Sequence, residues 1–137
     1  MNKVTLMEEA RKARLNAYAP YSHFMVGAAL LCADGTVVHG ANVENASYGL
    51  TSCAERNAIF AAVSSGKRDF CAIAVIGNTL AVPCGACLQV MSEFAPTMPV
   101  YIAGLDQDDI IESSVQALLP SQFTLKKTSG VMSSEYQ

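Results

Sequence analysis

Apolar residues follow two different spacings along this chain. Residues 2–17 carry Leu6, Ala10, Ala13 and Ala17 at helical intervals, which predicts an amphipathic helix. Ranges 53–64 and 84–95 predict two further helices on the same criterion, and "SVQALLP" predicts a short fourth one. The segments between them are rich in turn formers, as in "YAPYSHF" and "NASYGLTS".

Short apolar runs predict five strands, at 25–33, 37–44, 71–78, 99–104 and 110–113. "DG" at 34–35 joins the first two runs and indicates a hairpin. The continuous run at 71–78 is typical of a central strand that is buried on both faces. The gap at 105–109 is too short for a crossover helix, so the last two strands should be antiparallel. The order of elements predicts a three-layer α/β/α sandwich with a five-stranded mixed sheet.

The chain length suits one domain over residues 1–137, with a loose polar tail from about Lys126. No apolar run approaches the roughly 18 residues that a membrane span needs. The charged N-terminal helix does not resemble a signal peptide, so we expect a cytoplasmic protein that has no membrane partner.

Charge and hydropathy restrict the partners. The net charge is −3 and no basic cluster is present, which argues against a nucleic-acid partner and favours a small-molecule substrate. Hydrophobic residues make up 51% of the chain and charged residues only 15%, so we expect other subunits to cover some apolar surface.

Three of the five cysteines fall where two helices begin. "PCGAC" places Cys84 and Cys87 three residues apart at the head of one helix, so that both sulfurs face one point. Cys53 heads the neighbouring helix, and both helices should start at the carboxyl end of the central strands. Three ligands with one open position are the pattern of a catalytic zinc ion, whereas structural zinc sites close with four ligands.

Two other uses of these cysteines compete with a catalytic zinc site. Cys84 and Cys87 could form a redox pair, or half of a four-thiolate structural site with Cys32 or Cys71. Cys32 falls inside a strand, and Cys71 begins a strand at the far end of the sheet. His23 and His39 lie away from both helix starts and are expected to be ordinary surface or core residues.

Glu55, two residues after Cys53, favours a catalytic site over a non-catalytic zinc-binding module. A zinc-bound water is acidic enough to ionise near neutral pH, and an adjacent carboxylate can take and pass on its proton. A structural zinc site has no use for such a carboxylate. The combination C-x-E, about thirty residues, then P-C-x-x-C is the signature of zinc nucleoside and nucleobase deaminases.

From about Ala17 to Phe123 the sequence resembles the small homotetrameric cytidine deaminases. The segments that carry the resemblance are "AYAPYSHFMVGAAL", "GANVENASYGLTSCAERNAIF", "PCGACLQV" and "ALLPSQF". The resemblance implies hydrolysis of cytidine and deoxycytidine to uridine and deoxyuridine with release of ammonia, in pyrimidine salvage. It also implies one Zn²⁺ held by Cys53, Cys84 and Cys87, and a proton shuttle at Glu55.

The resemblance further implies substrate contacts from several segments. They are Phe24 against the pyrimidine ring, Asn42 and Glu44 at the ribose 3′-hydroxyl, backbone of Ala54 at the base, Ala46 and Tyr48 in a neighbouring subunit's site, and Phe123 closing the pocket. Asn42 and Glu44 alternate along a predicted strand end, where two polar groups on one side would suit a sugar diol.

One position departs from the family. Leu88 follows the second cysteine of C-x-x-C, where the family usually has Arg, and Arg56 is left as the cation that tempers the charge of the thiolates. The rival substrates for such a site are a modified cytosine nucleoside and a tRNA base, and the acidic net charge argues against tRNA.

Overall fold

The computed structural model describes residues 1–125, and within that range the chain forms a five-stranded sheet in the order β2-β1-β3-β4-β5. The strands are β1 (Gly27–Cys32), β2 (Val37–Ala41), β3 (Phe70–Gly77), β4 (Pro99–Gly104) and β5 (Ile111–Ser114). β3 and β4 are parallel and the other neighbours are antiparallel, as expected for the last pair. The mixed sheet and the fold class are therefore confirmed.

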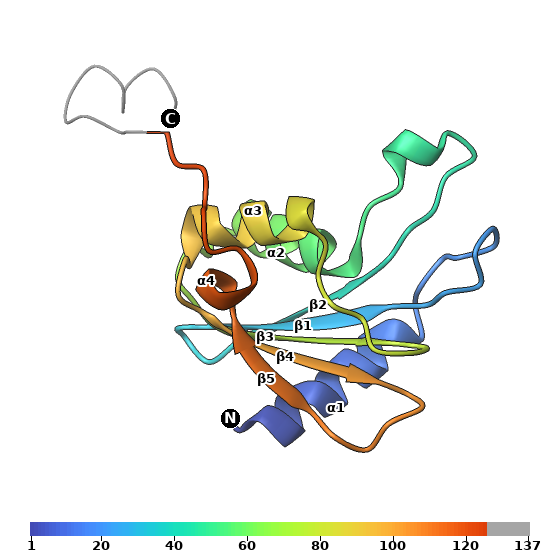
Figure 1. Ribbon diagram of the computed structural model, residues 1–137, viewed down its shortest axis with the longest axis horizontal. Helices are drawn as coiled ribbons and strands as arrows, with labels where there is room; N and C mark the ends of the chain where they lie inside the picture. Colours follow the sequence, from blue (N-terminus) through green and yellow to red (C-terminus); the bar gives the residue numbers. More distant parts are fainter. Residues whose placement is uncertain (126–137) are drawn as a thin grey trace.

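Helices cover both faces of the sheet (Figure 1). The helices are α1 (Lys3–Arg14), α2 (Ala54–Ser64), α3 (Gly85–Phe94) and the short α4 (Val115–Leu118). α1 packs on one face through Leu6, Met7 and Ala10, while α2 and α3 bury Ile59 and Met91 against the other. β3 lies at the centre and its residues Ala72–Gly77 are buried, as the continuous apolar run predicts. No helix among residues 1–125 is long and apolar enough to cross a membrane.

Several element ends differ from the sequence prediction. The first helix stops at Arg14 instead of residue 17, because the next three amides bond to carbonyls three residues back and tighten the chain into a turn. Tyr18 then donates its backbone N–H to the Asn42 carbonyl, which draws the chain away from the helix axis. The predicted tail from Lys126 lies outside the described residues.

β2 ends at Ala41, three residues earlier than predicted. Beyond it the chain leaves the edge of β1 and forms an excursion over residues 42–52, which includes the 3₁₀ turn η1 (Tyr48–Leu50) and projects from the body of the molecule (Figure 1). Val43 and Ser52 pair across the base of this excursion. The excursion returns the chain to the sheet at Cys53, where α2 begins.

Candidate active site

The starts of α2 and α3 bring three sulfur atoms together. Cys53 is the N-cap of α2, Cys84 is the N-cap of α3, and Cys87 lies in the first turn of α3. Their sulfur atoms lie within 4.8 Å of one another, and Cys84 Sγ is 3.6 Å from Cys87 Sγ. Within residues 1–125 this group contains no fourth His, Cys, Asp or Glu ligand.

The sulfur cluster fits Zn²⁺. Metal–sulfur bonds of about 2.3 Å at tetrahedral angles place two sulfurs about 3.8 Å apart, close to the separation of Cys84 and Cys87. Cys32 is buried in the core and Cys71 lies on β3 near its amino end, so neither joins the cluster. The structure thus supports the three-ligand interpretation over a four-thiolate structural site.

Arg56 gives the cluster a cationic neighbour. Its Nη2 donates to Cys53 Sγ at 3.4 Å. Without metal, hydrogen bonds from the Cys87 thiol and from Arg56 lower the pKa of Cys53 to about 5, and the pKa of Cys87 is raised because its proton is held toward the Cys53 sulfur. Leu88, by contrast, is a residue of α3 that is buried in the core, where it contributes apolar packing.

Glu55 is a buried carboxyl group beside the sulfurs. It is 5% exposed, and burial raises its pKa to about 7 in the metal-free protein. Its carboxyl group also interacts with Cys87, which lowers the pKa in part. A carboxyl group with a pKa near neutrality can both accept and donate a proton at physiological pH.

A cavity of about 290 Å³ opens in front of the cluster. Its walls are mostly apolar, and its polar groups are few, which is typical of small-molecule sites. The lining residues are Phe24, Val26, Asn42, Thr51, Cys53, Ala54, Glu55, Leu80, Ala81, Val82 and Cys84. Two cysteines of the cluster and Glu55 thus face the same space.

The structure brings some predicted substrate residues to this cavity and leaves others apart. Phe24, Asn42 and Ala54 line it. Glu44 instead borders a hollow beside Tyr21 and Tyr48, and Ala46 and Tyr48 are exposed on the 42–52 excursion. Phe123 is 68% exposed, with its carbonyl accepting a hydrogen bond from Gln89 Nε2.

Asn42 and Glu44 are both engaged within the chain. Asn42 Oδ1 accepts from Val26 N at 2.9 Å, and Asn42 Nδ2 donates to the Phe24 carbonyl at 2.8 Å. The Glu44 carboxylate accepts from the backbone amides of Tyr21 and Ser22 at 3.0 and 3.1 Å, and from the Ser22 hydroxyl. Both residues follow the end of β2 at Ala41, and Asn42 lines the cavity while Glu44 borders the neighbouring hollow, so their contact with a ribose stays a prediction.

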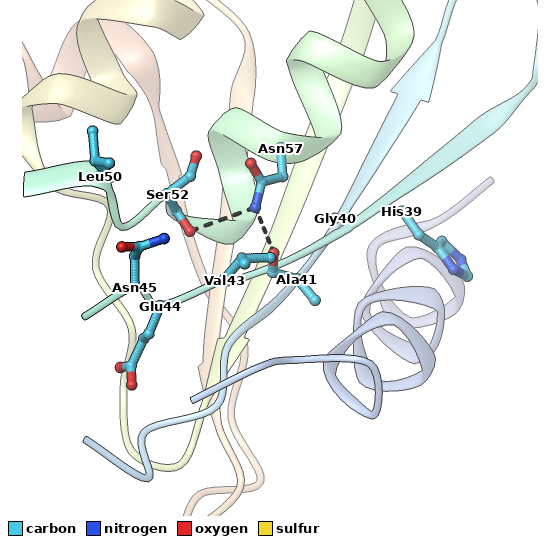
Figure 2. Close-up of a pocket in the computed structure, with 9 residues that line it drawn as sticks. All are labelled: His39, Gly40, Ala41, Val43, Glu44, Asn45, Leu50, Ser52 and Asn57. Atoms are coloured by element: carbon cyan, nitrogen blue, oxygen red, sulfur yellow. Dashed lines mark hydrogen bonds between the residues drawn. The ribbon is translucent and has the colours of Figure 1, made fainter. Parts of the chain in front are cut away.

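A second and larger hollow of about 470 Å³ lies along the edge of β2 and the 42–52 excursion. Figure 2 shows that Asn57 of α2 anchors this region, since its Nδ2 donates to the Ala41 carbonyl at 2.7 Å and lies 3.5 Å from the Ser52 carbonyl. Gly40 permits α2 to approach, because a Cβ there would lie 2.2 Å from the Ala54 carbonyl oxygen. These contacts determine where Cys53 and Glu55 sit relative to the sheet.

Sequence reasoning missed one wall of the cavity. Leu80, Ala81 and Val82 lie in the β3–α3 connection, which the sequence marked only as a loop. Their position directly before "PCGAC", at the carboxyl end of the central strand, was the available signal. His23 and His39 stay outside the cavity, and His39 instead contacts Glu9 at 2.9 Å.

Comparison with known proteins identifies relatives of the chain. Residues 1–103 match the model of the cytidine and deoxycytidylate deaminase zinc-binding region. The cytidine deaminase of Halalkalibacterium halodurans is 56% identical over 127 residues, covering 90% of this chain and 96% of the relative. That of Sporosarcina psychrophila is 52% identical, covering 90% and 93%.

A solved structure agrees with these matches. The crystal structure of cytidine deaminase from Burkholderia pseudomallei superposes with a TM-score of 0.86 at 52% identity, and the match covers 90% of this chain and 100% of that chain. The similarity to this structure therefore covers nine-tenths of the chain.

Proposed function

This chain belongs to the cytidine and deoxycytidylate deaminase family, and on that premise we propose that it hydrolyses cytidine and deoxycytidine to the corresponding uridines with release of ammonia. The observation that carries the proposal is the buried Glu55 carboxyl group beside three converging cysteine sulfurs at the end of a nucleoside-sized cavity. A pyrimidine-salvage role in a reducing compartment such as the cytoplasm accords with the five free cysteines.

The reaction exchanges an amino group for oxygen at C4 of the base, and one water molecule is consumed for each ammonia released. Zn²⁺ held by Cys53, Cys84 and Cys87 would act as a Lewis acid that makes water nucleophilic near neutral pH. Glu55 accepts one proton of the attacking water and delivers it to N3 of the base. It then takes the second water proton from the new C4 hydroxyl and passes it to the amino group, which leaves as ammonia while the C4 carbonyl forms. The buried position of Glu55 beside the sulfurs suits both transfers.

The cavity supports a pyrimidine nucleoside as substrate. Phe24 and Leu80 offer apolar surface to a flat ring, and the backbone of Ala54 lies beside the catalytic carboxyl group. Asn42 retains one free donor hydrogen and one free lone pair after its two backbone hydrogen bonds, and we assign these to the ribose. Glu44 Oε2 accepts a hydrogen bond from the Ser22 hydroxyl and keeps a further lone pair, which we assign to the ribose 3′-hydroxyl.

A homotetramer with shared sites accounts for the exposed residues of the 42–52 excursion. Tyr48 is 77% exposed and Leu50 is 71% exposed, and both belong to the η1 turn of the excursion. The hollow in Figure 2 lies at the open edge of the sheet beside them. In this proposal Ala46, Tyr48 and Phe123 complete the cavity of a neighbouring copy.

An absorbance assay of the purified protein with cytidine, coupled to ammonia detection, tests the activity. Turnover should stop after zinc is removed with a chelator and return when zinc is added. Cytidine and deoxycytidine should be far better substrates than free cytosine, since cytosine lacks the sugar that Asn42 would bind. Turnover of a tRNA or of a modified cytosine nucleoside in preference to cytidine would instead favour the rival substrates.

Mixed oligomers test the sharing of sites. A Glu55→Gln subunit and a Tyr48→Ala subunit each carry one defect, but a hybrid contains sites in which neither defect is present. Co-expression should therefore restore activity above that of either parent protein. If hybrids verified by mass spectrometry show only the average of the two parents, Tyr48 does not act in a neighbouring site.

A further inference from the structure

Residues 22–26, here called the Phe24 loop, are held by a residue that the sequence motifs do not include. Asn78 directly follows β3, and its side chain forms hydrogen bonds with the backbone on both sides of Phe24. Asn78 Nδ2 donates to the His23 carbonyl at 3.0 Å, and Asn78 Oδ1 accepts from Met25 N at 3.2 Å. The loop therefore rests on the end of the central strand.

Arg14, the last residue of α1, completes this arrangement. Its Nε donates to the Met25 carbonyl at 2.9 Å, and its Nη2 donates to Asn78 Oδ1. The end of α1 is itself fixed against β1, because a Cβ on Gly27 would lie 2.4 Å from Arg14 N. A rigid helix end and a rigid strand end thus meet at one short loop.

The loop has a backbone conformation that needs such support. His23 has a φ of 59°, in the left-handed region that residues other than glycine rarely adopt. Its N–H donates to the Ala19 carbonyl at 2.9 Å, and its carbonyl is the group that Asn78 binds. Without Asn78, the His23 carbonyl and the Met25 amide would both lose their partners, and the loop could relax to a more favourable conformation.

The phenyl ring of Phe24 lies close to the same strand end. Its Cε1 is 3.0 Å from the position that a Cβ on Gly77 would occupy, so the ring packs directly over the residue before Asn78. Phe24 also lines the cavity that holds Glu55. The position of this wall of the cavity therefore depends on how the Phe24 loop is attached to β3.

We infer that Asn78 and Arg14 are positioning residues for substrate binding, which hold the Phe24 loop so that Phe24 forms one wall of the cavity. The inference rests on the proposed function for its effect on catalysis, and on hydrogen bonding alone for its effect on the loop. Neither residue touches the cavity or the cysteines, so they act through Phe24 and not on the reacting atoms.

Steady-state kinetics of three variants tests the inference. Asn78→Ala removes two hydrogen bonds to the loop and should raise KM for cytidine by about tenfold while kcat stays within about threefold. Asn78→Asp keeps the acceptor oxygen for Met25 and Arg14 but loses the donor to the His23 carbonyl, so its KM should lie between those of wild type and Asn78→Ala. The control is Asn16→Ala, a change at an exposed asparagine near the end of α1, which should leave KM unchanged.

A double-mutant cycle with Phe24→Ala separates positioning from general destabilisation. If Asn78 acts through Phe24, then Asn78→Ala should raise KM much less in the Phe24→Ala background than in wild type. Equal effects in the two backgrounds, or a fall in kcat with unchanged KM, would overturn the inference. Should Asn78→Ala fail to fold, Arg14→Lys, which keeps the charge but loses the Nε donor to Met25, takes its place.

Amide hydrogen exchange provides a readout that needs no substrate. In Asn78→Ala the Met25 amide should exchange at least tenfold faster, while amides in the middle of β1 should keep their wild-type rates. Unchanged exchange at Met25 would show that Asn78 does not hold the loop. Failure of wild type to deaminate cytidine would reject the proposed function, and the exchange result would still decide whether the loop is held as described.

Discussion

The Nη2 atom of Arg56 lies 3.4 Å from the sulfur of Cys53, one helical turn earlier on α2. This contact places a permanent cation against a cluster of three sulfurs, which would carry three negative charges when all are thiolates. Arg56 Nε is also buried, without a hydrogen-bond partner among the described residues. Arg56 is half-buried and its side chain contacts the sulfur of Cys53, so its replacement should change the properties of the cysteine cluster.

Arg56→Gln should raise the pKa of Cys53 in the zinc-free protein from about 5 toward the ordinary thiol value, because one of the groups that stabilise the thiolate is lost. The pH dependence of Cys53 alkylation, followed by mass spectrometry of its peptide, measures this shift. Arg68→Gln, at an exposed arginine that contacts the Val63 carbonyl, is the matched control. An unchanged alkylation profile would show that Arg56 does not influence the sulfur.

Metal analysis should find one zinc ion per chain, and Cys84→Ala or Cys87→Ala should reduce zinc retention strongly, since each removes one of three converging ligands. Cys71→Ala is the matched control, because Cys71 is exposed and lies outside the cluster. Full zinc content in both ligand variants would contradict the assignment of this cluster as the metal site.

Glu55→Gln should retain zinc and fold normally but lose about 10²- to 10⁴-fold in kcat, because the amide cannot accept and deliver protons. The comparison requires kinetics and zinc content on the same preparation. Glu8→Gln, which alters an exposed glutamate on α1, should have no effect on either quantity. A kcat near that of wild type would exclude Glu55 from proton transfer.

The stability of the zinc-free protein should report the raised pKa of Glu55. Its pKa in the folded protein is about 7, above the ordinary 4.5, so the folded state binds more protons and the contribution of Glu55 to stability is lost as pH rises from 4.5 to 7. In Glu55→Gln the side chain does not titrate, so this pH-dependent loss of stability is absent. The free energy of unfolding of the variant relative to wild type should therefore increase by roughly 2 to 3 kcal/mol between pH 5 and pH 8.

Urea unfolding of both zinc-free proteins at matched concentration measures this difference. The cysteines titrate in both proteins, so the difference between the two curves reports the titration of Glu55 together with its coupling to Cys53 and Cys87. A difference that does not change with pH would mean that the carboxyl group is not desolvated in the folded protein.

Gly40→Ala should destabilise the protein by several kcal/mol or displace α2, because the added Cβ would lie 2.2 Å from the Ala54 carbonyl oxygen and 2.5 Å from the Ala58 backbone nitrogen. Thermal unfolding and zinc content are the measurements. Gly85→Ala is the control for stability, since a Cβ there meets no atom within 4 Å. Equal melting temperatures for the two variants would show that α2 does not depend on close approach to Gly40.

The sequence by itself determined the elements and the main chemistry of the site. Helical spacing and continuous apolar runs identified the sheet and its covering helices, because those patterns report burial along a single segment. The sequence also indicated that Cys84 lies beside Cys87, and that Glu55 lies close to Cys53. Each pair lies within the first turn of a single helix, so its spacing along the chain fixes its proximity.

Tertiary structure alone decided which distant groups share a space. The apolar wall at Leu80–Val82, the burial of Leu88, and the attachment of the Phe24 loop to Asn78 all depend on packing between elements far apart in sequence. Glu44 shows the limit well, because its carboxylate could bind a sugar or a backbone amide equally, and the course of the chain after Ala41 brings it to Ser22. Hydrogen-bonding capacity belongs to a residue type, but the partner it meets is set by the fold.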